Sequence, residues 1–430
     1  MPKLFSSIDE DLCVRAVMEC FTHKWQRGDI LSFVEEWAGI DRAVLRKEAM
    51  AGSCRLKVEA ADTIGMILYD VIEDICAGRD LDDLIGPVQI EQRIDGNSGK
   101  TRNIATLDIW HQLLGHVTKL SLDKLFMTRI LPTQHASIPG RGQTCLKDQA
   151  RRYLHRDGLE IRYIQKTDVH HAYESTKYSV LNSLIQKEIP RAKKTLKILE
   201  YLGTLAPGGH LIIGGYLDAW LFNYAMSYAM REMYSCGHER RGVTTYYIQR
   251  IESYMDDFGL MASTRSGLTK AVKKLNRWLA SNLHLQLKMS TDIIKLYSTD
   301  GEKLKKHASK ASKRICPGLD MGGYVIHRTH TTIRARVFLR ARRQWLRGWK
   351  ELQETGTLHL YRAQKIIAYN GFLEQSDSRK IRIKYRTTTL LEKSKEVVSF
   401  YGRLDSRKRK ETVNAVYEHY CKRKARLCNT

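Results

Sequence analysis

Apolar residues recur with helical spacing through most of the first 84 residues of the chain. Ser7 and Glu10 have the spacing of a capping box, and after them apolar side chains return every three or four positions. Two further stretches of this kind cover residues 30–37 and 64–72. The pattern predicts a helical N-terminal region over residues 1–94. It packs against the rest of the protein, or alternatively holds structured RNA or a second subunit.

Later segments alternate between turn signals and regular patterns. A turn cluster at 95–99 is followed by a helical run over 110–126. Residues 271–279 predict an amphipathic helix, and the alternation in 283–288 predicts a strand. From residue 332 onward the pattern is helical, with Arg residues between aromatic ones.

The composition indicates a globular protein that binds a polyanion. The chain has 430 residues, 43% of them hydrophobic, which is enough for two or three domains. Its net charge is +25, and residues 334–430 hold 25 Lys and Arg against 9 Asp and Glu. We find no signal peptide, no membrane-spanning run and no zinc spacing among the nine cysteines. These features predict a cytoplasmic protein with reduced thiols and no membrane partner.

The run Tyr254-Met255-Asp256-Asp257 carries the most specific chemistry. Two adjacent carboxylates among apolar residues are costly to bury unless a cation neutralises them. They are expected at a hairpin tip, where Mg²⁺ with substrate phosphates fits. An isolated Asp-Asp pair is more often only a solvated turn. A second acid upstream, Asp168, is followed five residues later by Tyr173, and this pairing favours the metal site.

Both segments resemble the catalytic motifs of reverse transcriptases, in the order and spacing of that family. The resemblance implies a right-hand polymerase of class α+β, with fingers, an antiparallel palm sheet backed by helices, and a helical thumb. It also implies two Mg²⁺ ions, replaceable by Mn²⁺, that activate the primer hydroxyl and the leaving pyrophosphate. The ligands implied are Asp168, the backbone of Val169, Asp256 and Asp257.

The resemblance extends to residues that contact the incoming nucleotide. The aromatic residue that the family has at this position lies under the sugar and excludes a 2′-hydroxyl. The resemblance implies this role for Tyr173, and the alternative is an aromatic residue of the core. Leu211, Ile213 and Gly214 fit the family's template-contact segment, whereas Ile212 replaces its proline and Asp218-Ala219 replaces its Ser-Gln pair. Ile213 in place of a glutamine resembles the diversity-generating branch. The nucleotide-binding candidates are Lys100, Arg102, Arg141, Tyr173, Ile213 and Gly214.

Three further groups are implied by the same resemblance. Lys288 is the candidate general acid for the departing pyrophosphate, or else a solvated lysine. The primer-grip turn corresponds to Met321, Gly322, Gly323 and Tyr324. The thumb residues expected to contact backbone phosphates are Arg334, Arg336, Arg340, Arg342, Arg343 and Arg347.

The predicted function is RNA-directed DNA synthesis by nucleotidyl transfer onto a primer. The predicted division is a helical region over 1–94, fingers and palm over 95–330, and a basic thumb with its tail over 331–430. Expected partners are an RNA template, a DNA product strand and dNTPs, with a second copy or partner protein as a further candidate. The subfamily favoured is bacterial and defence-associated, with a cognate noncoding RNA as template. The alternatives are a diversity-generating or other mobile retroelement enzyme, and a non-catalytic RNA-binding scaffold.

Overall fold

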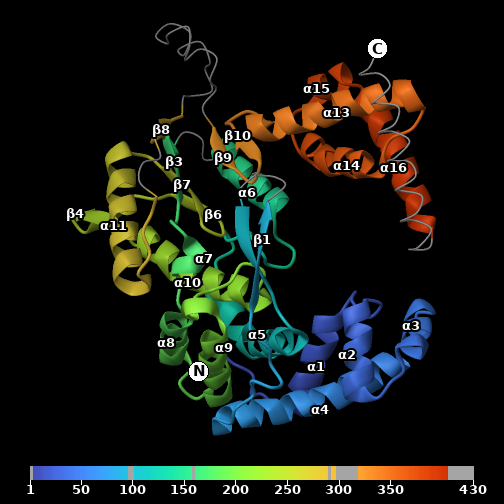
Figure 1. Ribbon diagram of the computed structural model, residues 1–430. Coiled ribbons are helices and arrows are strands. Elements are labelled where there is room, and N and C mark those ends of the chain that lie inside the picture. The colour runs from blue at the N-terminus through green and yellow to red at the C-terminus, as the bar shows by residue number, and fades with distance from the viewer. Residues whose placement is uncertain (1–2, 95–100, 157–159, 289–291, 297–317, 405–430) are drawn as a thin grey trace, which may run out of the picture. The chain divides into compact units, whose positions relative to one another are not determined.

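A computed structural model describes residues 3–94, 101–156, 160–288, 292–296 and 318–404. The fold is mixed, with many helices and several small sheets (Figure 1). The chain forms two compact units. The first comprises Met1–Gly142 and Thr167–Ile293, and the second comprises Gln143–Lys166 and Ile294–Thr430. The division into fingers, palm and thumb stays a prediction.

The N-terminal region of the first unit is helical, as predicted. Its helices are α1 (Glu10–Phe21), α2 (Gly28–Ala38), α3 (Arg42–Met50) and α4 (Arg55–Ala77). The predicted capping box is wrong, because the side chain of Asp9 caps α1 by accepting a hydrogen bond from the Leu12 N–H (2.9 Å). Helix α1 packs closely on α4: a Cβ at Gly65 would lie 2.6 Å from Val14 Cγ2.

A hairpin and a buried helix follow. Strands β1 (Gln89–Ile94) and β2 (Thr101–Thr106) pair in antiparallel fashion. Helix α5 (Ile109–Arg129) confirms the helical run predicted over 110–126 and packs against α1 and against α10 (Tyr216–Tyr234). Between them in sequence lie the helices α7 (Ala172–Ser175), α8 (Tyr178–Glu188), α9 (Lys193–Leu205) and the short η1 (Pro207–Gly209).

The sheet of the first unit positions the acidic motifs. Strands β6 (Arg250–Tyr254) and β7 (Asp257–Ala262) form an antiparallel hairpin, and β7 neighbours the end of β3 (Tyr163–Asp168). Helix α11 (Arg265–Leu283) packs on β7 (Figure 1). A separate hairpin is formed by β4 (Gly237–Arg240) and β5 (Val243–Tyr246).

The strand predicted over 283–288 is wrong. Leu283 is the buried last residue of α11, and His284 ends the helix in the left-handed conformation (φ 56°). Only Leu287 forms a β-bridge, with Val169. The alternating pattern arises because Leu285 also faces inward, and its N–H bonds to the Leu279 carbonyl (3.1 Å).

The second unit combines small strands with a helical bundle. Its elements are α6 (Gln143–Arg156), the start of β3, β8 (Ile294–Lys295), β9 (Leu319–Met321), β10 (Tyr324–Ile326), β11 (Thr331–Ile333), α13 (Ala335–Thr355), α14 (Leu360–Glu374), α15 (Arg379–Lys384) and α16 (Thr387–Arg403). Trp345 is fully buried in the bundle core. At Gly348, a Cβ would lie 2.9 Å from Ile366 Cδ1, so this glycine lets α13 approach α14 closely.

Among the helices that the structure describes, none is long and apolar enough to cross a membrane.

Candidate active site

The tip of the β6–β7 hairpin carries the Asp pair. Tyr254 pairs with Asp257, so Met255 and Asp256 form a two-residue loop. Met255 has a positive φ of 55°, a conformation that non-glycine residues rarely adopt and that short hairpin loops require. Ser253 Oγ donates a hydrogen bond to the Met255 carbonyl (3.2 Å) and braces this loop. The predicted hairpin tip is confirmed.

Backbone hydrogen bonds bring Asp168 to this tip, although 88 positions separate it from Asp256 in the chain. The N–H of Val169 bonds to the Asp256 carbonyl (3.1 Å), and the Lys288 N–H bonds to the Asp168 carbonyl (2.8 Å). Three distant segments therefore meet at one place. Neither of these bonds uses the Val169 carbonyl oxygen, the atom predicted as a metal ligand.

The carboxylates of this site repel one another. The pKa of Asp256 is raised to about 7, first by burial and then by the adjacent Asp168 and Asp257 carboxylates. Asp168 Oδ1 is buried and has no hydrogen-bond partner, while Asp168 Oδ2 pairs with the Lys288 ammonium. A buried acidic group with an unsatisfied oxygen is stabilised by a cation.

The donor set fits a divalent ion with oxygen ligands. Asp168 and Asp256 offer carboxylate oxygens, and Asp257 is close enough to affect the ionisation of Asp256. As they stand, no three His, Cys, Asp or Glu side chains within the described ranges are grouped closely enough to hold a metal. Mg²⁺ commonly takes one or two carboxylates and completes its shell with water and substrate phosphates, so two convergent acids suffice for a candidate site.

Tyr173 lies beside the hairpin loop. Its hydroxyl is 3.7 Å from Met255 Sδ, and its ring stacks on Phe222 with centroids 5.4 Å apart. Burial and the nearby Asp218 and Asp256 raise the pKa of its phenol. The ring thus lies next to the loop that carries Asp256, as a sugar gate requires.

A buried carboxylate that the sequence interpretation missed shapes the neighbouring turn. Asp218 Oδ1 accepts hydrogen bonds from the Ile212 N–H (2.9 Å) and from the Tyr178 hydroxyl (3.1 Å). Its side chain is almost fully buried, and burial raises its pKa to about 6. The signal available in the sequence is an acid in the first turn of an otherwise apolar helix, directly after Gly214-Gly215.

The turn is also fixed to strand β2. The Ala105 N–H bonds to the Ile213 carbonyl (2.8 Å). Gly214 has a φ of 114°, and a Cβ there would lie 2.8 Å from the Ala105 carbonyl oxygen. Ile213 and Gly214 are therefore held by β2 on one side and by Asp218 on the other, and only glycine fits at 214.

A second buried network lies under the hairpin and was also missed. His135 Nε2 is 2.6 Å from Glu252 Oε2, and Arg250 Nε donates to Glu252 Oε1 (2.7 Å). The side chains of His135 and Glu252 are fully buried. The Ser253 N–H also bonds to the Thr133 carbonyl (2.8 Å). This network fixes strand β6, which carries the loop.

The predicted phosphate-binding cations lie in different settings. Lys100 lies outside the described residues. Arg102 is exposed on β2, opposite Arg93. One terminal nitrogen of Arg141 donates to the carbonyls of Leu131 (2.7 Å) and Gln134 (2.9 Å), so this guanidinium braces its own loop.

The primer-grip candidates form a tight turn in the second unit. Met321 and Tyr324 are buried, and Gly322 and Gly323 have φ values of 58° and 86°. Tyr324 packs against Phe372 of α14 with ring centroids 5.3 Å apart. The turn predicted here is confirmed, and its contact with a primer stays a prediction.

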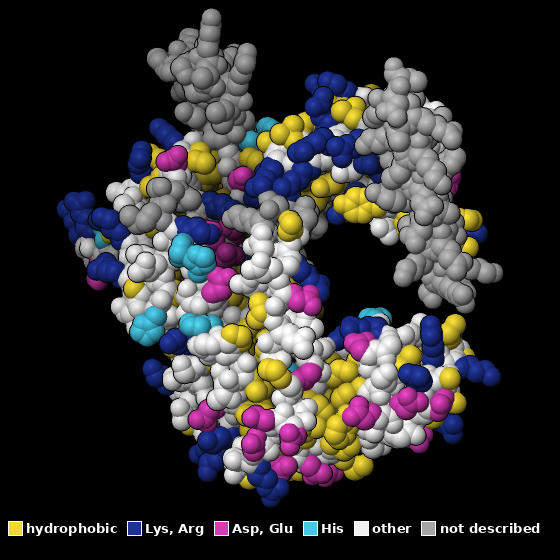
Figure 2. Space-filling view, in the orientation of Figure 1, with side chains coloured by type: hydrophobic (Ala, Val, Ile, Leu, Met, Phe, Trp, Pro, Cys, Tyr) yellow, Lys and Arg dark blue, Asp and Glu magenta, His cyan; other side chains and the backbone are white. Residues whose placement is uncertain are grey.

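Most of the thumb candidates lie on α13, away from its buried face. Arg334 precedes the helix and pairs with Asp320, so its charge is already partnered. Arg342 donates to the Tyr385 hydroxyl (3.0 Å). Arg340 is half-buried, and the exposed members are Arg336, Arg342, Arg343 and Arg347. Lys and Arg side chains gather over α13 in Figure 2.

Comparison with known proteins gives no family. No protein-family model matches the chain, and no curated protein matches it. One solved structure that matches is apo telomerase from Candida tropicalis, truncated from its C-terminal domain, with a TM-score of 0.37 and 11% identity. The match covers 58% of this chain and 55% of that one, so the chain spans about half of its length. A likeness of this degree defines neither family nor fold.

Proposed function

We propose that the protein is an RNA-directed DNA polymerase that extends a primer with deoxynucleotides. The observation that carries the proposal is the junction of Asp168 with Asp256: a 3.1 Å backbone bond between Val169 and Asp256, an unsatisfied Asp168 oxygen and a raised pKa at Asp256. Two convergent acids with an unmet need for positive charge are what a nucleotidyl-transfer site requires.

Each group has a role in this proposal. Asp168, Asp256 and Asp257, with the Val169 carbonyl, would hold two Mg²⁺ ions, which supply Lewis acidity to the attacking and leaving oxygens. Lys288 pairs with the Asp168 carboxylate and would give a proton to the departing pyrophosphate. Tyr173, next to the Met255–Asp256 loop, would exclude ribonucleotides by contact with a 2′-hydroxyl.

The finer parts of the proposal come from the sequence resemblance. The bacterial defence-associated reverse transcriptases are the subfamily proposed, with a cognate noncoding RNA as template. The fingers and palm are proposed to cover residues 95–330, and the thumb with its tail to cover residues 331–430. The exposed arginines of α13 are proposed to contact the phosphates of the duplex. The departure at Ile212 and Ile213 keeps a diversity-generating or other mobile-element enzyme as the alternative.

One contact favours a second candidate, a non-catalytic RNA-binding scaffold. The ammonium of Lys288 pairs with Asp168 and so neutralises an acid that a metal would otherwise need. In a scaffold this ion pair would replace the metal permanently. In an enzyme it would exchange for metal on substrate binding.

Primer extension separates these two functions. Purified protein with a primed RNA, Mg²⁺ and dNTPs is expected to incorporate deoxynucleotides, and Asp256→Asn to reduce the rate about 10³-fold, because several kcal/mol of charge stabilisation is lost. Glu174→Gln is the matched control. This substitution removes the same charge from an exposed acid that pairs with His171, and it leaves Asp168 and Asp256 unchanged. Equal rates of incorporation for wild type and Asp256→Asn would reject the proposal that the protein is a polymerase.

A further inference from the structure

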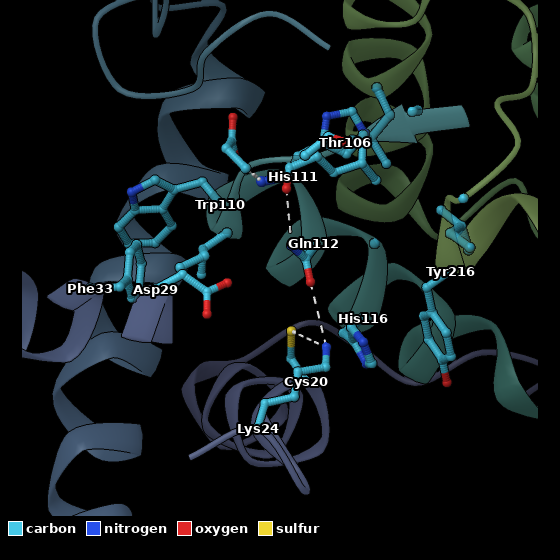
Figure 3. Close-up of a pocket in the computed structure, with 18 of the residues that line it drawn as sticks. Cys20, Lys24, Asp29, Phe33, Thr106, Trp110, His111, Gln112, His116 and Tyr216 are labelled. Atoms are coloured by element: carbon cyan, nitrogen blue, oxygen red, sulfur yellow. Dashed lines mark hydrogen bonds between the residues drawn. The ribbon is translucent and has the colours of Figure 1, made fainter. Parts of the chain in front are cut away.

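The first unit contains a large pocket of about 1250 Å³ that the proposed chemistry does not use. Helices α1 and α2 form one wall, and the start of α5 with the turn at 214–218 forms another. In Figure 3, Phe33, Trp110 and Asp29 lie on one side, and His116 and Tyr216 on the other. The pocket therefore joins the N-terminal helices to the turn that Asp218 braces.

The pocket is acidic in a strongly basic protein. Its lining contains six carboxylate residues and two cations, whereas the whole chain has a net charge of +25. Arg27 is paired with Asp29 (2.6 Å). Glu36 and Asp83 are exposed, and their side chains make no hydrogen bond or ion pair with any other residue that the structure describes. Figure 2 shows acidic side chains gathered beside apolar surface where Figure 1 places α1, α2 and α4.

Aromatic rings line the same space. Trp37 and Trp110 are edge to face with centroids 5.1 Å apart, and Phe33 packs on Trp110 at 5.2 Å. His116 stacks on Tyr216 at 4.0 Å. Aromatic faces attract cations and pack against aliphatic stems.

Buried imidazoles add hydrogen-bond acceptors. His111 is only 4% exposed, and its Nδ1 has no partner. His116 is 8% exposed, and its Nδ1 is likewise without a partner. Burial lowers the pKa of His111 to about 4 and that of His116 to about 3, so both rings are neutral at pH 7. These neutral rings add no positive charge to that of Lys24 and Arg27.

The chain itself already places one ammonium here. Lys24 Nζ lies 3.5 Å from Gln112 Oε1 and 4.0 Å from Cys20 Sγ, and it forms no ion pair with a carboxylate among the described residues (Figure 3). These are long contacts for a cation. Lys24 is thus a weakly held occupant that a better-matched ammonium could move aside.

We propose that this pocket binds a primary ammonium group carried on a flexible aliphatic stem. The carboxylates would pair with the charge, the Trp rings would cover the stem, and the buried imidazoles would accept hydrogen bonds. Free polyamines and lysine side chains of a partner protein share this chemistry. A nucleotide phosphate is disfavoured because the lining is acidic.

Calorimetric titration of the full-length protein tests the site. Spermidine and a lysine-rich peptide are titrated separately. For each of them, a titration with MgCl₂ at the same ionic strength is the control for charge screening. Saturable binding is expected for at least one of them, and Glu36→Gln combined with Asp83→Asn is expected to weaken it about tenfold. Binding of spermidine alone would identify a free polyamine as the ligand, and binding of the peptide alone would identify a partner's lysine.

Two matched variants make the test specific. Glu35 neighbours Glu36 on the same helix but pairs with Arg42 (3.8 Å) and does not line the pocket, so Glu35→Gln should leave affinity unchanged. Lys24→Met removes the internal competitor and should tighten binding about threefold. No saturable binding of either probe, or equal losses in Glu35→Gln and the double variant, would overturn the proposal.

Discussion

Two carboxylates in the first unit, the half-buried Asp256 and the buried Asp218, have raised pKa values in different surroundings. Asp218 is surrounded by donors, since the Ile212 N–H and the Tyr178 hydroxyl both bond to Oδ1. Asp256 has another carboxylate, Asp168, as its neighbour. A buried acid that accepts hydrogen bonds from nearby donors can stabilise a turn, whereas an acid that faces another acid requires a cation.

Lys288 gives the sharpest test of this contrast, because it is the cation now paired with Asp168. Lys288→Met is expected to lower the rate of nucleotide addition about 10²-fold if it acts as the general acid. The same change should raise the affinity for Mn²⁺, because a competing ammonium is removed. Single-turnover primer extension and metal titration measure the two effects. An unchanged rate would reject the general-acid role.

Asp218→Asn is expected to change the free energy of unfolding and its dependence on pH. The folded pKa, about 6, exceeds the unfolded value of 3.8, so the stability due to the neutral carboxyl of Asp218 is present below about pH 4 and is lost as pH rises through 6. That loss is on the order of 3 kcal/mol, and the Asp218→Asn variant would not show it. Urea unfolding at pH 4.5 and 7.5 measures the difference. Parallel pH profiles for the two proteins would contradict the account of Asp218.

Tyr173 connects the two acids, because both raise its pKa. Tyr173→Ala should improve the use of ribonucleotides relative to deoxynucleotides by about 10-fold to 100-fold, since a steric contact with the sugar is removed. Tyr173→Phe keeps the ring and loses only the 3.7 Å contact with Met255, so it should retain selectivity. The ratio of kcat/KM for the two sugars is the measurement. Unchanged selectivity in Tyr173→Ala would reject the gate.

The smallest effect is expected for substitutions on the surface of the second unit, where the charged side chains are exposed to solvent. Arg347 is exposed on α13, and Arg347→Ala should lower the slope of log affinity against log salt by about 0.9 for a duplex. Arg334→Ala provides the comparison, because this side chain is already paired with Asp320. Filter binding across a salt series gives both slopes. A larger change for Arg334 would contradict the proposed role of the exposed face.

The local features of the site could be predicted from the sequence, and the long-range ones could not. The turn at Met255–Asp256 follows from two adjacent carboxylates among apolar residues, and α5 from its helical spacing. The strand expected at 283–288 failed because Leu283 and Leu285 face inward from a helix end, where alternation looks the same. The convergence of Asp168 with Asp256 was implied only by the family resemblance, and the Val169–Asp256 bond that produces it was not predicted.

Asp218 and the acidic pocket were missed for a physical reason. Asp218 is satisfied by Ile212 and Tyr178, and Tyr178 lies 40 positions away in sequence. The pocket draws its walls from α1, α2, α5 and the 214–218 turn. Spacing along one segment carries no information about such distant partners, so only the fold places them together.

Binding of Mn²⁺, followed by electron paramagnetic resonance, tests the central claim most directly. Wild-type protein should bind the ion, and Asp168→Asn and Asp256→Asn should each weaken binding at least about tenfold, while Asp218→Asn should bind as wild type does. Equal Mn²⁺ affinity in wild type, Asp168→Asn and Asp256→Asn would contradict the assignment of these two acids as a metal site.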